Sequence, residues 1–313
     1  MPPVQKHYKT GTLAGVRQLN LYYQAWLPAS NIRSKGIKSG DIKSGDIKSG
    51  DIRSNRVLAN VVLVHGLGEH IGRYRHVAAT FNQAGHALWA FDNLGHGRSD
   101  GQRGHIERWA DYTENIGRFV AFVRQASPDR PLFIYGHSLG ALMVLTYALK
   151  QPDAISGLVI SGPPIQPVGV AKPWRVTFAK TFAQLLPRLS LNLGLGSEAL
   201  SRDPKVIRRA KADSLMHSVA TLRWGTETMD AIATVRQQIY QLQLPILMLH
   251  GAADQINDVK GSHELFEAMV QTDKTLLVYP DNYHELHNDL DKEQVLQDVL
   301  TWIEERLGRD VRG

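Results

Sequence analysis

Short, continuously apolar runs alternate with helix-like segments along most of the chain. The runs are typical of buried strands and cover residues 58–65, 87–91, 132–135, 157–161, 244–250 and 275–279. The segments between them carry apolar residues at helical spacing and predict helices near 73–84, 111–125, 139–150, 261–270 and 292–306. This alternation predicts an α/β fold, with a mainly parallel sheet covered by helices on both faces.

Two regions depart from this rhythm. Residues 8–27 alternate loosely around Ala14-Gly15 and predict an antiparallel hairpin at a sheet edge. Between residues 163 and 240, prolines interrupt helix-like pieces and no strand run is evident. We interpret 163–240 as a cap, or lid, inserted within a single domain that spans residues 1–313.

One stripe within this cap is a candidate contact for an apolar ligand. Trp174, Phe178 and Phe182 fall on one side of a helical wheel together with Leu185 and Leu186, although Arg175 lies at the edge of the stripe. The stripe either packs on the domain below it, lines an acyl-chain pocket or contacts lipid. We take Trp174, Phe178 and Phe182 as candidate substrate-binding residues.

A five-residue repeat lies between the predicted hairpin at 8–27 and the strand at 58–65. Ile37-Lys-Ser-Gly-Asp41 recurs at 42–46 and 47–51, and a decayed copy follows. Three short copies cannot form a solenoid core, and a basic docking loop is the other functional interpretation. We favour a mobile surface loop over residues 35–56.

Composition and charge narrow the classes of function. The chain has 313 residues, of which 43% are hydrophobic and 21% charged, as in globular proteins. Its net charge is +6, and residues 33–56 supply +4 of this with seven basic and three acidic side chains. No basic face with interleaved aromatic residues accompanies the charge, so a nucleic-acid partner is not predicted. Oligomeric state is not predicted either.

The chain contains no cysteine, which excludes disulfides and thiol chemistry. Its N-terminus lacks the apolar core of a secretory signal, and no apolar run reaches the roughly 18 residues of a membrane span. We therefore expect a cytoplasmic location, with peripheral contact to a membrane through the cap left open.

The strand at 132–135 and the helix after it flank the sequence Gly136-His-Ser-Leu-Gly140. In a G-x-S-x-G turn, small residues let the strand and helix pass closely, and the central serine is held in a strained conformation at the helix N-terminus. Backbone amides there favour a developing oxyanion. We predict Ser138 as a catalytic nucleophile, although a Gly-rich connection with an incidental serine has the same letters.

A serine nucleophile needs a base, and the base needs an orienting carboxylate. On this architecture the chain order is serine, acid, histidine. Asp254 follows the strand at 244–250 and is the predicted acid, while Asp258 is an alternative whose position also suits a helix cap. His284 follows the strand at 275–279 and is the predicted base, whereas His287 is expected in the next helix.

The backbone amides of Leu67 and Leu139 are the predicted oxyanion hole, the first from the loop after the strand at 58–65 and the second directly after Ser138. His65 and Asp92 are expected to shape loops. The spacing of the histidines gives no set of three metal ligands, so neither a metal nor an organic cofactor is predicted.

Together these segments resemble the monoglyceride lipase/lysophospholipase branch of the α/β-hydrolase superfamily, from about Val61 to Trp302. The resemblance rests on His65-Gly-Leu-Gly-Glu-His70, Phe91-Asp-Asn-Leu-Gly-His-Gly-Arg-Ser99, Gly136-His-Ser-Leu-Gly140, His250-Gly-Ala-Ala-Asp254 and Tyr283-His284. It implies an eight-stranded sheet, a helical cap over a lipophilic tunnel, and hydrolysis of a lipid ester, either a monoacylglycerol or a lysophospholipid. It places the family's nucleophile, acid and base at Ser138, Asp254 and His284.

The chain departs from this branch in three respects. Ala141 stands where the family often has glycine, the cysteines often found near the tunnel are missing, and the repeat is not a family feature. Acyl transfer to an alcohol and hydrolysis of an amide or peptide are alternative activities for the same three residues. A non-catalytic binding protein is disfavoured because all three are present.

Overall fold

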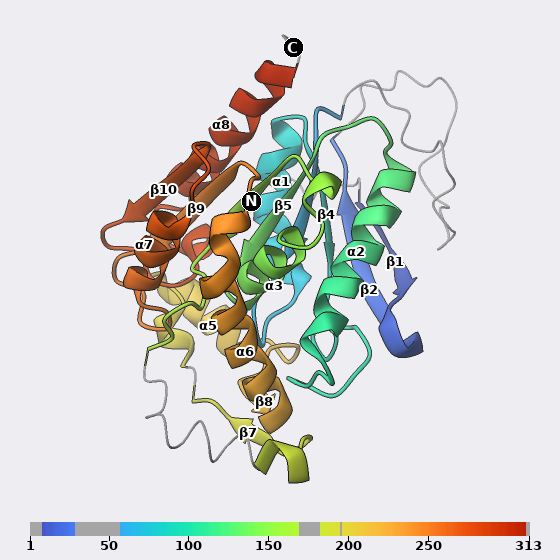
Figure 1. The fold of residues 1–313 in the computed structure, drawn as a ribbon, viewed down its shortest axis with the longest axis vertical. Helices are drawn as coiled ribbons and strands as arrows, with labels where there is room; N and C mark the ends of the chain where they lie inside the picture. Colours follow the sequence, from blue (N-terminus) through green and yellow to red (C-terminus); the bar gives the residue numbers. More distant parts are fainter. Residues whose placement is uncertain (1–7, 29–56, 169–181, 195, 311–313) are drawn as a thin grey trace.

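A computed structural model describes residues 8–28, 57–168, 182–194 and 196–310 of the chain. The predicted loop at 35–56 lies outside the described residues, as do Trp174 and Phe178 of the apolar stripe. Figure 1 shows a central sheet with helices packed along both of its faces.

The sheet has eight strands in the order β1-β2-β4-β3-β5-β6-β9-β10. β1 and β2 form the predicted hairpin at one edge, and β2 is also antiparallel to β4. All other neighbouring strands of this sheet are parallel, which confirms the predicted α/β-hydrolase fold class. The strands are Tyr8–Ala14 (β1), Asn20–Trp26 (β2), Asn60–Val64 (β3), Ala87–Phe91 (β4), Leu132–His137 (β5), Gly157–Ser161 (β6), Ile246–Gly251 (β9) and Lys274–Tyr279 (β10).

Alternate strand residues point to two cores, one on each face of the sheet. Val62 and Ile134 belong to the core beneath α2, α3, α6 and α7, whereas Val61 and Phe133 belong to the core beneath α1 and α8. The helices are Arg75–Gln83 (α1), Trp109–Ala126 (α2), Leu139–Ala148 (α3), Pro204–Ala212 (α5), Leu222–Gln238 (α6), Val259–Ala268 (α7) and Lys292–Asp310 (α8). Short 3-10 turns cover Val16–Gln18, Ile71–Tyr74, Pro152–Ala154, Ser197–Ala199, Ile239–Gln241 and Leu286–Asn288.

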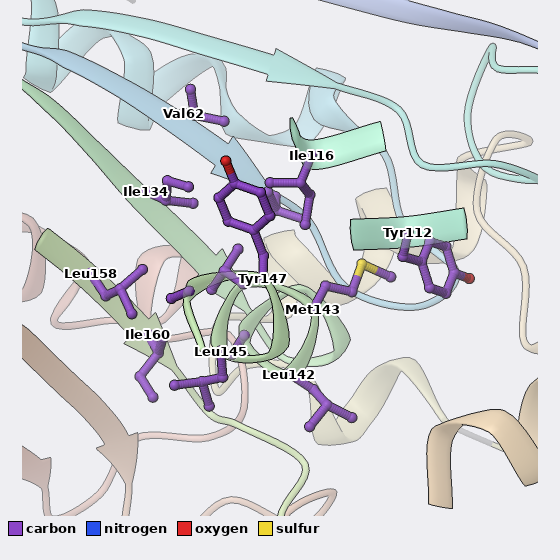
Figure 2. Close-up of a cluster of buried hydrophobic side chains, with 14 of the residues drawn as sticks. Val62, Tyr112, Ile116, Ile134, Leu142, Met143, Leu145, Tyr147, Leu158 and Ile160 are labelled. Atoms are coloured by element: carbon purple, nitrogen blue, oxygen red, sulfur yellow. The ribbon is translucent and has the colours of Figure 1, made fainter. Parts of the chain in front are cut away.

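Helix α3 lies at the centre of one core. Every residue of α3 is buried, because the sheet covers one side of the helix and α2 and α6 cover others. Figure 2 shows side chains of α3 lying among strand residues, with Tyr112 and Ile116 of α2 nearby. Each large apolar side chain buried there contributes about 1.5–3 kcal/mol to folding, so the helix that follows the G-x-S-x-G turn is firmly held.

Residues 182–240 contain elements that periodicity did not predict. β7 (Ser190–Asn192) and β8 (Val219–Thr221) form a separate two-stranded antiparallel sheet. Each has only three residues, too few to show alternation. The last helix of the segment, α6, packs along α3 and buries Ala231, Ile232 and Val235 in the main core. The cap boundaries at 163 and 240 stay a prediction.

Among the described residues, no helix is both long enough and apolar enough to cross a membrane. Predicted strand and helix boundaries differ from the observed ones by a few residues, as for 58–65 against Asn60–Val64 and 261–270 against Val259–Ala268. Such differences are expected where loops continue the apolar pattern.

The backbones of α3 and β3 approach each other closely where they cross. A Cβ atom added to Gly140 would come within 2.1 Å of the Val64 carbonyl oxygen, which is backbone and cannot turn aside. We therefore predict that Gly140→Ala lowers the free energy of unfolding by about 1–3 kcal/mol. Urea unfolding followed by circular dichroism measures this change.

Gly225→Ala in α6 is the matched control. No heavy atom lies within 4 Å of a Cβ built there, so the added methyl group is expected to stabilise the helix by up to about 1 kcal/mol. Equal unfolding free energies for Gly140→Ala and the unaltered protein would contradict the packing argument.

Candidate active site

Ser138 occupies a strained turn between β5 and α3. Its backbone angles are φ 53° and ψ −121°, a conformation that residues other than glycine rarely adopt. The turn is held by a hydrogen bond from the Ser138 N–H to the Ser161 carbonyl oxygen at 2.8 Å. A Cβ built on Gly136 would lie within 3 Å of Val144 and Gly140, so the absence of a side chain lets the strand reverse directly into the helix.

The structure brings Ser138, His284 and Asp254 together. They follow β5, β10 and β9, whose carboxyl ends share one edge of the sheet. His284 Nε2 lies 2.8 Å from Ser138 Oγ, and His284 Nδ1 lies 2.7 Å from Asp254 Oδ2. The side chains of His284 and Asp254 are only 4% and 1% exposed. The arrangement orients one imidazole between a hydroxyl and a carboxylate.

The electrostatics of this pair favour a charged carboxylate and a basic imidazole. Burial raises the pKa of Asp254, but His284 and His250 outweigh burial and hold it well below its usual range. Burial lowers the pKa of His284, yet the Asp254 carboxylate more than compensates and raises it above 6.5. Asp254 Oδ1 also accepts hydrogen bonds from the Ile256 and Asn257 amides at 2.8 and 3.0 Å.

The alternative residues lie elsewhere. Asp258 is the N-cap of α7, where its side chain accepts a hydrogen bond from the Lys260 amide. His287 is buried in the turn Leu286–Asn288 and stacks on Tyr74 with ring centroids 4.5 Å apart. Asp92 accepts hydrogen bonds from the Ile71 and Arg98 amides, as a loop-shaping residue does.

The loop after β3 lies beside Ser138. A Cβ built on Gly66 would be 3.0 Å from Ser138 Cβ, so this glycine allows the close approach. Within the described part of the chain, the amides of Leu67 and Leu139 donate no hydrogen bond. His65 braces the loop by accepting from the Asn93 amide at 2.9 Å, and burial lowers its pKa to about 3.

A buried ionic cluster connects this loop to the segment that carries His284. Glu69 accepts hydrogen bonds from the Gly66 amide at 2.7 Å and from the Tyr74 hydroxyl at 2.8 Å. Arg73 pairs with Glu69 and bidentately with Glu285, the residue after His284. Burial raises the pKa of Glu69 despite Arg73, whereas Arg73 overcomes the effect of burial on Glu285 and lowers its pKa.

A cavity of about 240 Å³ opens above Ser138. Its apolar wall is formed by Leu67, Leu200, Ala210, Met216 and Ile256. Two contacts tie the far wall to the loop after β3: His217 N–H donates to the Gly68 carbonyl at 2.9 Å, and His70 Nε2 lies 2.9 Å from Asp213 Oδ2. Residues between β7 and β8 therefore form the roof of the cavity.

The predicted substrate contacts are only partly visible. Phe182 is described and is 37% exposed, but it does not line the cavity above Ser138. No group of three or more His, Cys, Asp or Glu side chains in the described ranges is arranged to hold a metal ion.

Comparison with known proteins places this site in a family. The sequence model described as "Serine aminopeptidase, S33" matches residues 55–291. The chain belongs to this family. The match spans every residue of the site, from Leu67 to His284.

Several relatives of this S33-family chain carry the name of a lipase. It is 34% identical to the monoacylglycerol lipase of Mycolicibacterium smegmatis over 242 residues, which cover 77% of this chain and 86% of that protein. It is 32% identical to the monoglyceride lipase of Rattus norvegicus over 251 residues, which cover 78% and 81%. These relatives confirm the predicted resemblance to the monoglyceride lipase branch and to carboxylic ester hydrolases.

Solved structures show the same fold. The monoacylglycerol lipase of Paleococcus ferrophilus has a TM-score of 0.74 at 34% identity and covers 79% of this chain and 94% of its own. A soluble variant of the Saccharomyces cerevisiae monoglyceride lipase, solved with a substrate analogue, has a TM-score of 0.77 at 22% identity and covers 97% of both chains.

Sequence reasoning missed the ionic cluster of the S33-family site. Glu69 lies within the motif His65–His70 and Arg73 three residues after it, but nothing in their spacing signals that both are buried. Glu285 directly follows His284 in a predicted loop. A glutamate there is expected to be exposed to solvent, because this residue type is rarely buried. The only available signal was the density of charge in two segments that both border the predicted site.

The charge on Asp254 predicts the titration of His284. In Asp254→Asn, burial remains while the carboxylate is lost, so the pKa of His284 is expected to fall. Histidine signals followed by NMR across pH measure the shift.

Asp258→Asn removes one negative charge from the same loop and is the control. Asparagine also caps helices, so this variant should keep both its stability and the His284 titration. An unchanged pKa of His284 in Asp254→Asn would refute the electrostatic assignment.

Proposed function

We propose that the protein hydrolyses the carboxylic ester of a monoacylglycerol through an acyl-enzyme formed on Ser138. The observation that carries this proposal is the continuous contact from Ser138 Oγ through His284 to Asp254, at 2.8 and 2.7 Å. The lipase relatives support the lipid ester as substrate, because they are 32–34% identical over most of the chain.

The proposed reaction has two steps. His284 Nε2 takes the Ser138 proton as Oγ attacks the ester carbonyl, and the protonated imidazole then gives that proton to the departing alcohol. Water, deprotonated by His284, attacks the acyl-enzyme and releases the fatty acid. Asp254 keeps the imidazole oriented and stabilises its charged form. The free amides of Leu67 and Leu139 receive the oxyanion, and each such donor is worth about 3 kcal/mol.

The cavity walls support an uncharged head group. Its charged lining residues each have a partner within the protein: Glu69 and Glu285 pair with Arg73, Asp213 with His70, and Lys211 with Glu198. Binding a phosphodiester would require one of these pairs to open, whereas glycerol hydroxyls need only hydrogen-bond partners. We therefore favour monoacylglycerol over lysophospholipid.

The same charge pairs disfavour peptide hydrolysis, the activity that the family description suggests. An aminopeptidase must hold the substrate's free ammonium group, and a carboxylate is the usual partner. The three carboxylates that line the cavity are already engaged by Arg73 and His70. Acyl transfer to an alcohol uses the same residues as hydrolysis. The two reactions differ only in whether an alcohol or water accepts the acyl group.

Ser138→Ala is expected to abolish both hydrolysis of a medium-chain monoacylglycerol and labelling by a fluorophosphonate, because both require the Oγ nucleophile. Fatty-acid release and mass spectrometry of the intact protein measure the two effects. Ser161→Ala, which alters the hydroxyl at the end of the neighbouring strand, is the control and should still be labelled.

A substrate panel separates the alternatives. Monoacylglycerols, lysophospholipids of equal chain length and an aminoacyl p-nitroanilide are compared, with glycerol added to reveal transfer products. Faster turnover of the anilide, or persistent labelling of Ser138→Ala, would overturn the proposal.

We also propose that the cap contacts a lipid surface through a leucine ridge, defined as Leu185, Leu186, Leu189, Leu191 and Leu193. Their exposed fractions range from 41% to 72% within a nine-residue stretch. Such a density of exposed apolar side chains is unusual on a soluble surface. The ridge ends at Leu193, where the segment that roofs the cavity begins, so a docked cap would bring the cavity close to membrane-borne substrate.

Replacing Leu185 and Leu186 together by serine is expected to weaken binding to phosphatidylcholine vesicles by at least about tenfold, because two large apolar side chains no longer leave water. Vesicle sedimentation measures the binding. Hydrolysis of a water-soluble short-chain ester should stay unchanged. Val270→Ser, at another exposed apolar position, is the control. Equal vesicle binding by the double variant and the unaltered protein would refute membrane contact through the ridge.

A further inference from the structure

A second histidine lies behind the triad. His250 stands near the end of β9 and is completely buried, as is Ser262 in the first turn of α7. His250 Nε2 lies 3.4 Å from Asp254 Oδ2, the oxygen that also faces His284. The carboxylate of Asp254 therefore lies between two imidazoles.

The remaining contacts determine which ring nitrogen carries a proton. His250 Nε2 lies 3.0 Å from the Asn257 carbonyl oxygen, which can only accept, so Nε2 must be protonated. Its N–H thus points toward Asn257 and Asp254 together. In a neutral ring Nδ1 then bears the lone pair, and the Ser262 hydroxyl at 2.7 Å donates to it.

The loop around Asp254 is held from the opposite side as well. Asn257 Nδ2 donates to the Gly162 carbonyl at 2.8 Å, and the Asp258 amide donates to the Gln166 carbonyl at 2.8 Å. These bonds fix the backbone of the loop. The Ile256 and Asn257 amides hold Oδ1 of the Asp254 carboxylate, and the described contact on the far side of Oδ2, the oxygen that reaches His284, is His250.

We propose that His250, oriented by Ser262, is a positioning residue that holds the Asp254 carboxylate toward His284. The contact chain is Ser262–His250–Asp254–His284–Ser138, with a serine and a histidine on each side of one carboxylate. This inference rests on the proposed function, because it assigns a role in the triad that the proposed hydrolysis uses.

The distance of 3.4 Å is longer than an ordinary hydrogen bond, so His250 acts on Asp254 as a directed dipole. Loss of this contact leaves the carboxylate bound at Oδ1 by two amides but directs Oδ2 less firmly toward His284. The imidazole would then be less well oriented and less strongly stabilised when protonated. At metal sites, removal of such an outer orienting partner costs about 10- to 100-fold in activity, and we expect a loss of this size here.

Two amide variants separate positioning from packing. His250→Gln places its amide nitrogen near the position of Nε2 and keeps a donor toward Asp254. His250→Asn is also polar, but its shorter amide lies near the position of Nδ1 and faces Ser262. We expect kcat of His250→Asn to fall about 10- to 100-fold with KM little changed, and kcat of His250→Gln to stay within about threefold of the unaltered protein.

The pH profile is the readout that a purely structural role would not move. The acid limb of kcat/KM reports the protonation of His284, which Asp254 favours. A carboxylate that is less firmly directed toward His284 stabilises the protonated ring less, so the limb moves to lower pH in His250→Asn but not in His250→Gln. Glu69, Glu285 and His137 also face His284, and these variants leave them in place.

Ser262→Ala provides a test that leaves the ring in place. Without the hydroxyl, Nδ1 loses its hydrogen-bond donor, so the ring is less firmly oriented toward Asp254 although Nε2 keeps its proton. A smaller fall in kcat and a shift of the acid limb in the same direction are expected. Thermal unfolding of each variant verifies that it is folded, and Ser262→Ala decides the matter if His250→Asn is not.

The outcomes distinguish the two levels of inference. If the unaltered protein neither hydrolyses the esters nor reacts with a fluorophosphonate at Ser138, the proposed function fails. If it does both, while folded His250→Asn and Ser262→Ala match His250→Gln in kcat and in pH profile, the positioning role of His250 is overturned.

Discussion

The site depends on keeping one buried carboxylate charged. The side chain of Asp254 is 1% exposed, and an isolated carboxylate at such a depth would bind a proton. Two backbone amides, His284 and His250 surround it and lower its pKa instead. The parallel sheet makes this possible, because β9 and β10 are neighbours and deliver the carboxylate and the imidazole to the same edge.

The strained turn at Ser138 depends on the packing of α3. A residue held at a positive φ costs about 1–3 kcal/mol and persists only where its surroundings fix it. Here a fully buried helix and the close contact of Gly140 with β3 hold it. The packed core thereby holds the Ser138 hydroxyl at the wall of the cavity, near two amides that donate no hydrogen bond within the described part of the chain.

The strands, the hairpin and the order of the site residues were predictable because each depends on local pattern. A run such as Leu132–Tyr135 is continuously apolar because both faces of its strand are buried. A residue just after such a run must lie at the edge of the sheet where the strand ends. Glu285 and the β7–β8 pair were not predictable. Glu285 is buried only because Arg73, 212 residues away along the chain, reaches it, and β7 has too few residues to show alternation. Pairing between distant segments leaves no periodic trace in the sequence.

The ionic cluster beneath the site has more negative than positive charge. Two glutamates, Glu69 and Glu285, share the single guanidinium of Arg73, and both help to raise the pKa of His284. In the proposed reaction the imidazole becomes charged as serine attacks, so this excess is arranged for the transition state before substrate binds. Because Glu69 also holds the Gly66 amide, the same cluster places the loop that would receive the oxyanion. His284 and the loop after β3 are thus fixed relative to one another through one buried cation.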